Sequence, residues 1–224
     1  MNSSRQEPGL GEFSSAIAED LSGLAELHAS ELSASALAAL LAVDYPQGNA
    51  LQFSSKDALE ASQQLRQAIR GLDREAMQSS LHTLAADYAG IYLNHRYQAS
   101  PCESVWTNAD ALSHQEAMFS VRTWYQKHHL QVVNWRICSD DHLVSQLQFI
   151  AHLIAHGEKQ GLASWDEAIL FMDSHLLTWL PRFVNQVTSH CHTQFYATLA
   201  HFTLYYLQEL RLLLTEAVSQ KPCS

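Results

Sequence analysis

The stretch QFYATLAHFTLYYLQELRLLLTEAV, residues 194–218, decides the fold of this chain. Large apolar side chains recur in it at steps of three and four, the spacing of one helical face, at Phe195, Leu199, Phe202, Tyr206, Leu210 and Leu213. Polar residues interrupt the stretch at His201, Gln208, Glu209, Arg211 and Glu216. Because such residues are costly inside a bilayer, we expect a long helix buried in a protein core rather than a membrane span.

The same spacing continues outward from this stretch through most of the chain, and no sustained alternation predicts strands. The expected helices cover roughly 13–29, 35–43, 54–69, 73–93, 113–129, 139–154, 164–180 and 194–218. Three of them are expected to open with capping boxes, Ser54 with Asp57, Ser113 with Glu116 and Ser164 with Glu167. Ser139 is expected to cap the helix that follows it, and Pro181 to interrupt the seventh helix.

These elements predict an all-α bundle of about eight helices in two lobes. Residues 1–11, with Pro8, Gly9 and Gly11, are expected to form a loose tail. Residues 131–140 lack helical spacing and hold β-branched residues, so we expect a hinge there. The N-terminal lobe would then span 1–130 and the C-terminal lobe 141–224.

The composition indicates a protein with an acidic surface. Acidic residues number 23 against 13 basic ones, and no Lys or Arg occurs between Gln6 and Ser55. A nucleic-acid-binding protein would show a basic face, so the sequence excludes that class. The acidic surface either suits a basic partner or is the ordinary charge balance of an acidic cytoplasmic protein. The four cysteines form no CxxC pair, and the N-terminus has no basic segment before an apolar run. We therefore expect a cytoplasmic protein with free thiols, without stable membrane insertion.

Motifs that would indicate an enzyme are absent. The chain has no GxxxxGK[ST], GxGxxG or GxSxG pattern. His152 and His156 are spaced as metal ligands on a helix, but the glutamate of an HExxH motif is missing. His190-Cys191-His192 has no second ligand pair to join it. We therefore expect a binding protein without a catalytic or metal site. A metal-dependent helical hydrolase and a generic helical scaffold remain alternatives.

The segment 97–111 is a long connection, and long ordered loops often carry function. It holds Pro101, Val105 and Trp106 between polar residues. Trp106 either anchors a bound peptide or packs across a lobe.

Several motifs, in this order, resemble the TorD/DmsD/NarJ family of molybdoenzyme chaperones, and its TorD branch most. Residues 87–92 (DYAGIY) are similar to the family's D-Y-x-x-L-F helix end, and residues 101–106 (PCESVW) to its P-x-E-S-V-[YW] loop. Asp141-His142-Leu143 matches the D-H-[IL] start of a helix, and residues 171–183 match F-[FM]-x-x-H-[LI]-x-x-W-x-x-x-F. Cys138-Ser139 stands where the family usually has E-P, so the rigid turn that proline supplies is lost.

The resemblance implies a cytoplasmic, wholly helical and non-catalytic chaperone. Such proteins bind the apo form of a molybdopterin-containing reductase and its twin-arginine signal peptide, or leader, assist cofactor insertion and delay export. Trimethylamine N-oxide reductase is the expected client. Family members need no cofactor, some bind GTP weakly, and they occur as monomers and as domain-swapped homodimers. A swap would pivot at residues 131–140.

The resemblance and the residue pattern together predict the peptide-binding site. An apolar groove is expected to be lined by Tyr88, Ile91, Tyr92, Pro101, Val105 and Trp106, with Glu103 and Ser104 in the same loop. Asp141 and His142 would approach it from the second lobe, and Asp141 would pair with an arginine of the leader.

Overall fold

The computed structural model describes residues 9–72, 77–94, 96–107, 114–133, 139–160 and 162–220. Within these ranges the chain is helical, and the one β-type contact is an isolated bridge between Cys102 and His142. The prediction of an all-α fold is therefore confirmed. No helix among the described residues is both long and apolar enough to span a membrane.

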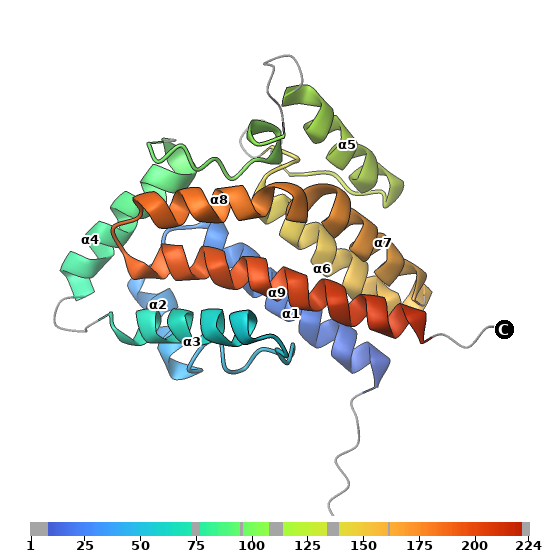
Figure 1. The fold of residues 1–224 in the computed structure, drawn as a ribbon, viewed down its shortest axis with the longest axis horizontal. Helices are drawn as coiled ribbons and strands as arrows, with labels where there is room; N and C mark the ends of the chain where they lie inside the picture. The colour runs from blue at the N-terminus through green and yellow to red at the C-terminus, as the bar shows by residue number, and fades with distance from the viewer. Residues whose placement is uncertain are drawn as a thin grey trace, which may run out of the picture.

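The elements follow one another along the chain with short irregular connections (Figure 1). They are α1 (Leu10–Ala29), α2 (Ala34–Ala42), α3 (Lys56–Arg70), α4 (Met77–Tyr88), the π-helical turn η1 (Ala89–Leu93), the 3-10 turn η2 (Glu103–Val105), α5 (His114–Lys127), α6 (Leu143–Gln160), α7 (Ala163–Phe171), the π-helical turn η3 (Met172–Leu176), α8 (Leu177–His190) and α9 (Gln194–Ser219). Because η1 continues α4, and α7, η3 and α8 follow one another without a break, the described residues form eight helical segments besides the short 3-10 turn η2, as the sequence predicted.

Helix α9 forms from the apolar stretch 194–218 and buries residues along most of its length. It packs against α3, α8 and α7, and α8 runs beside it (Figure 1). The long N-terminal helix α1 packs along α6. The Tyr206 hydroxyl of α9 donates a hydrogen bond to Asp20 of α1 at 2.9 Å, so the two long helices are also joined to each other.

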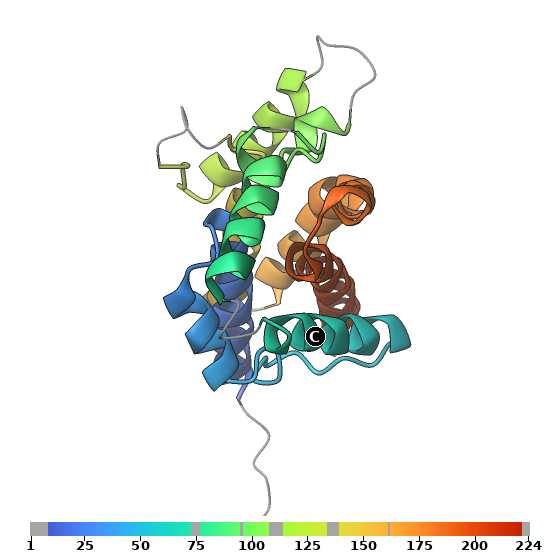
Figure 2. The same cartoon turned by 90° about the vertical axis from the view of Figure 1, so that its left-hand side faces the viewer.

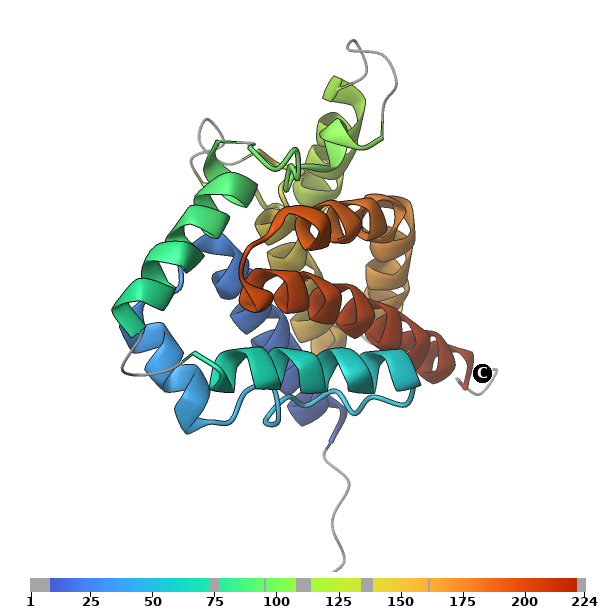
Figure 3. The same ribbon diagram turned by 60° about the vertical axis from the view of Figure 1, so that its left-hand side comes forward.

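Two further views show how the helices enclose the core. Figure 2 shows α1 and α2 on one side and α8 and α9 on the other, with α3 crossing below them. Figure 3 shows α4 closing one flank, while α5 lies at the end of the molecule opposite α3.

Residues from both sides of the predicted hinge share one hydrophobic core. Its buried members include Ile17 and Leu65 from the N-terminal part and Leu147 and Leu210 from the C-terminal part. The division into lobes 1–130 and 141–224 stays a prediction, as does domain swapping. Residues 134–138 of the hinge lie outside the described residues.

Several expected helix ends are wrong for identifiable reasons. Ser55 rather than Ser54 caps α3, because its hydroxyl accepts the Ala58 amide at 3.2 Å while Ser54 is held by Glu209. Ser164 does not cap α7, which begins one residue earlier; its hydroxyl donates to the Leu153 carbonyl of α6 instead.

The start of α6 is also capped differently from the prediction. The Ser139 hydroxyl bonds to Asp141, and the ring Nδ1 of His142 accepts the Val144 amide at 3.2 Å. His142 therefore supplies the cap that was expected from Ser139.

Two expected boundaries shift as well. Pro181 lies inside α8 and does not end it. A proline removes one backbone hydrogen-bond donor from a helix. The buried side chains of α8 pack in the core and hold the helix together across this position. Of the predicted tail 1–11, residues 10 and 11 belong to α1, and residues 1–8 lie outside the described residues. The expected helix starts at Asp73 and Ser113 also lie outside them.

Candidate functional site

The predicted site residues of α4 and η1 form an aromatic cluster against α1 and α9. The rings of Tyr88 and Tyr92 lie 4.8 Å apart, and both approach Tyr196 of α9, at 6.1 and 6.3 Å. The Tyr88 hydroxyl donates to the carbonyl of Ala29, the last residue of α1, at 2.8 Å. Ile91 is fully buried. This cluster ties the end of α4 to the end of α1.

A buried histidine completes the cluster from the α1 side. His28 is 1% exposed and its ring contacts the Tyr92 hydroxyl through Nδ1 at 2.5 Å and the Thr203 hydroxyl through Nε2 at 2.8 Å. The Thr203 hydroxyl donates its proton to the Leu199 carbonyl, so it can only accept from His28. Nε2 of His28 therefore donates to Thr203, and Nδ1 accepts from the Tyr92 hydroxyl. Burial lowers the pKa of His28 to about 3 and raises that of Tyr92 well above 10, so both groups are neutral at pH 7.

Asp87, which precedes this cluster, joins α4 to the start of α9. Its fully buried carboxylate accepts the Tyr97 hydroxyl at 2.8 Å, the His192 amide at 3.1 Å, and the Thr193 amide and hydroxyl, both at 2.6 Å. A carboxylate at this place also complements the positive end of the α9 dipole. The Asp87 position in the DYAGIY motif is therefore structural.

Gly90 is required in the same motif because Tyr97 lies against it. A Cβ atom at residue 90 would meet the Tyr97 ring at 2.6 Å, which is inside van der Waals contact. The Tyr97 amide also bonds to the Gly90 carbonyl at 3.1 Å. Tyr97 thus fixes the direction that the chain takes after η1.

The loop that contains Pro101, Glu103, Ser104, Val105 and Trp106 is bonded along its backbone to the start of α6. The Leu143 amide donates to the Pro101 carbonyl at 2.7 Å, and the Glu103 amide to the Asp141 carbonyl at 3.1 Å. The Asp141 carboxylate accepts the Ser104 amide at 2.8 Å. The structure therefore brings the PCESVW and D-H-L motifs together, as the sequence predicted for these residues.

The side chain of Glu103 joins this loop to α6 and η3 through a second set of contacts. The Glu103 carboxylate, 3% exposed, accepts from Gln146 of α6 at 2.7 Å and from His175 of η3 at 3.0 Å. A buried carboxylate needs such partners, because an unpaired charge in the core is costly. Gln146 and His175 were not singled out as site residues from the sequence, although His175 stands in the 171–183 motif.

The predicted site residues differ in what they present to solvent. Val105 is 48% exposed, while Ser104, Trp106, His142 and Tyr92 are partly buried. Trp106 donates its indole N–H to the Ser100 carbonyl at 2.7 Å, which holds the ring against the loop. Burial lowers the pKa of His142 to about 4.

Asp141, by contrast, has no exposed surface. One carboxylate oxygen accepts the Ser104 amide and the other the Ser139 hydroxyl. In this arrangement the carboxylate is occupied within the protein. The expectation that it pairs with a leader arginine stays a prediction.

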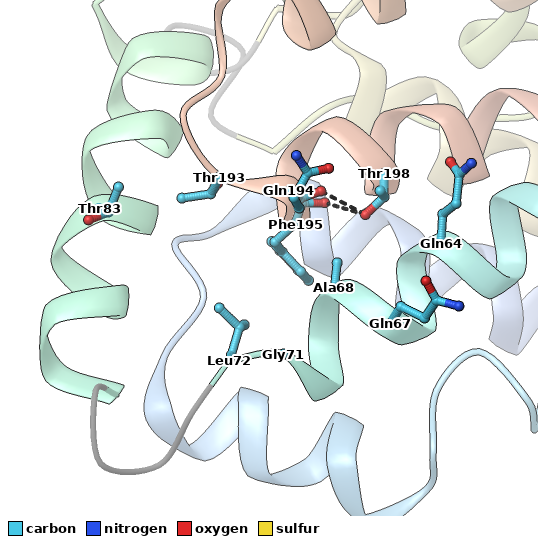
Figure 4. Close-up of a pocket in the computed structure, with 10 residues that line it drawn as sticks. All are labelled: Gln64, Gln67, Ala68, Gly71, Leu72, Thr83, Thr193, Gln194, Phe195 and Thr198. Carbon is cyan, nitrogen blue, oxygen red and sulfur yellow. Dashed lines mark hydrogen bonds between the residues drawn. The ribbon is translucent and has the colours of Figure 1, made fainter.

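A pocket of about 750 Å³ opens away from these residues, between α3, α4 and the start of α9 (Figure 4). Its lining is uncharged and contains glutamine and threonine side chains with one buried aromatic ring: Gln64, Gln67, Thr83, Thr193, Gln194, Phe195 and Thr198. It includes none of the residues predicted from the sequence.

The histidines that suggested metal binding make other contacts. His156 Nδ1 donates to the His152 carbonyl at 2.8 Å, and His190 Nδ1 to the Gln186 carbonyl at 2.9 Å. Among the described residues, no three His, Cys, Asp or Glu side chains converge as a metal site would require.

Comparison with known proteins places the chain in a family. The sequence model described as "Nitrate reductase delta subunit" matches residues 57–185. The chain is 29% identical to Chaperone protein TorD of Vibrio cholerae over 73% of its own length and 77% of the relative's. It is 30% identical to Chaperone protein TorD of Shewanella oneidensis over 62% and 64%, and to that of Colwellia psychrerythraea over 56% of each chain.

The matched range runs from the first turn of α3 into α8 and so contains both motif groups of the site. With its all-helical fold and its relatives named TorD, this chain belongs to the nitrate reductase delta subunit family, which is the TorD/DmsD/NarJ family that its motifs resemble.

Proposed function

We propose that this protein is a cytoplasmic chaperone that binds the apo form of a molybdopterin-containing reductase together with its twin-arginine leader. In this role it assists cofactor insertion and delays export until insertion is complete. Family membership, with relatives named Chaperone protein TorD, is the observation that carries the proposal. The chain is a chaperone of this family and not an enzyme.

The client that we propose is trimethylamine N-oxide reductase, because the motifs are most similar to the TorD branch. The protein would act without a required cofactor, as a monomer or a homodimer. Weak GTP binding, which the resemblance implies for some members, stays a prediction.

Two features support a peptide partner. The chain carries a formal charge of −10, which favours encounter with a basic leader. Val105 and Trp106 offer an apolar surface on a loop that buried contacts of Glu103 and Asp141 hold in place. In this proposal Val105, Trp106, Ser104, His142 and Tyr92 contact the leader. The buried residues Tyr88, Ile91, Pro101, Glu103 and Asp141 position them.

Calorimetric titration with a synthetic leader tests the proposal. The leader of the reductase is titrated beside the same peptide with both arginines changed to glutamine. Binding in the micromolar range or tighter, lost with the glutamine peptide, is expected. Absence of binding to the leaders of several candidate reductases would contradict the leader-binding role.

A pair of matched variants tests the surface. Val105 and Leu212 are apolar side chains of similar exposure, 48% and 52%, on different elements. Val105→Ala should weaken leader binding several-fold, since removing two methyl groups from an apolar contact surface costs about 1 kcal/mol of binding free energy. Leu212→Ala should leave the affinity unchanged. Equal effects of the two substitutions would show that the loop is not the contact surface.

A further inference from the structure

The C-terminal end of α1 carries negative charge where a helix is normally complemented by cations. Glu26 lies in its last turn and Glu31 two residues beyond its end, and both side chains are exposed. The end of a helix already has a partial negative charge from its carbonyl groups. The basic residue of this turn, His28, is buried and neutral. The two carboxylates are therefore uncompensated by the helix itself, an arrangement that costs stability.

An apolar pocket of about 370 Å³ opens beside these carboxylates, between α1 and α2. Glu26 and Glu31 are part of its lining, and its other walls are largely aliphatic, with Leu27, Leu32, Ala36, Ala39 and Leu40. Tyr45 also lines it, and the Tyr45 ring packs edge-on against Phe202 of α9, with ring centroids 6.1 Å apart. A pocket with aliphatic walls and an acidic edge suits an apolar side chain that is flanked by cationic ones.

A second, shallower hollow adjoins this pocket at Glu26. Gly23 and Glu26 line both this pocket and a shallow hollow between α1 and α6, where Glu19 adds a further exposed carboxylate. The rest of that hollow is lined mainly by small residues: Ser15, Ala18, Ser22, Ala151 and Ala155. The pocket and the hollow thus adjoin each other along α1, and Glu19, Glu26 and Glu31 present carboxylates beside them.

The same end of α1 adjoins the aromatic cluster of the proposed leader site. Tyr88 donates to the Ala29 carbonyl at 2.8 Å, and the Leu32 amide donates to the Tyr196 hydroxyl at 3.4 Å. Burial, and with it the charge of Glu31, raises the pKa of Tyr88. Glu31 therefore lies close to a residue that the sequence predicted for peptide binding.

We propose that Glu26 and Glu31 bind the paired arginines of the leader and that the pocket between α1 and α2 takes an apolar side chain of the segment that follows them. The inference rests on the proposed function. It assigns arginine recognition to Glu26 and Glu31, which are exposed, because Asp141 has no exposed surface. The partner's chemistry, cations followed by apolar residues, matches the carboxylates and aliphatic walls of the pocket.

The test is a mutant cycle on the full chain. Leader affinity is measured by calorimetry for the wild type and for Glu26→Gln combined with Glu31→Gln, each with the arginine leader and with the glutamine leader. The matched control combines Glu12→Gln with Glu116→Gln, which removes the same charge from two other exposed sites. Glu12 lies 14 residues before Glu26, about 21 Å along the helix.

The Glu26/Glu31 variant should bind the arginine leader about tenfold more weakly, and the control less than about twofold. The variant should lose little further affinity with the glutamine leader, because the partners of the arginines are already gone. Ala39→Phe, which adds a ring to an exposed position in the pocket wall, should weaken binding to a similar extent without lowering the melting temperature.

The outcomes separate the two proposals. A wild type that binds no leader overturns the proposed function and this inference with it. Arginine-dependent binding by the wild type that is equal in the Glu26/Glu31 variant and the control overturns this inference alone. Unchanged binding by Ala39→Phe overturns the assignment of the pocket.

Discussion

Replacing Asp87 with alanine should destabilise the fold more than the loss of any exposed carboxylate. The substitution leaves four donors without their acceptor: the Tyr97 hydroxyl, the His192 amide, and the amide and hydroxyl of Thr193. Removing one partner of a buried charged network costs about 3–5 kcal/mol. His192 and Thr193 are partly exposed, so water replaces some of the lost bonds, and we expect about 3 kcal/mol.

Urea unfolding followed by circular dichroism measures this loss. The midpoint should fall with an unchanged slope, and the melting temperature should fall by about 6–12 °C for a chain of this size. Asp57→Ala is the control, because Asp57 is exposed in the first turn of α3 and should cost less than about 1 kcal/mol.

A double-mutant cycle with Tyr97→Phe isolates one of the four bonds. The phenylalanine should cost about 1–2 kcal/mol in the wild type and almost nothing when Asp87 is already alanine. The reasoning is refuted if Asp87→Ala costs less than about 1 kcal/mol, or if Tyr97→Phe costs the same in both backgrounds.

Three further predictions probe other contacts. Gly90→Ala should destabilise the fold by roughly 1–3 kcal/mol, because the added Cβ would lie 2.6 Å from the Tyr97 ring. Gly23→Ala should stabilise it by about 0.5–1 kcal/mol, because no atom lies within 4 Å of the added Cβ. The opposite order of stabilities in urea unfolding would contradict this packing. Because the pKa of His28 is about 3 in the folded chain and near 6.5 in the unfolded one, the unfolded state binds the extra proton between these values. Stability should therefore fall as pH drops from 6.5, by about 1.4 kcal/mol per unit from His28, and the pH profile of His28→Gln should lack this component of the slope. Glu209→Ala should speed amide hydrogen exchange in α3 relative to α6, since the carboxylate accepts both amides that precede the helix; equal changes in the two helices would argue against it.

The helical fold was predictable because it depends on local periodicity. The apolar spacing in residues 194–218 predicted α9 to within one residue of its observed end. The same spacing predicted α2, where the apolar run ends at Pro46. Helix starts were less predictable, because a serine can cap only if no distant group claims it. Glu209, 155 residues away, holds Ser54 and leaves the cap of α3 to Ser55.

The candidate site was predictable in its motifs and not in its roles. The sequence placed Asp141 near the PCESVW loop, which the hydrogen bond to Ser104 bears out. It could not show that this carboxylate is fully buried, because burial depends on how α6 and the loop pack. Gln146 and His175 were missed as partners of Glu103 because they lie 43 and 72 residues away in the chain.

The fold class, the order of the helices, the acidic charge and the family motifs follow from the primary structure, because each depends on residue identity and local spacing. Which of the acidic side chains are available to a partner depends instead on how the helices pack. Packing consumes Asp87, Glu103 and Asp141 as acceptors inside the bundle and leaves Glu26 and Glu31 exposed beside an apolar pocket. The residue type alone does not show what an acidic side chain does. Its burial and its hydrogen-bond partners determine whether it stabilises the fold or is available to bind another chain.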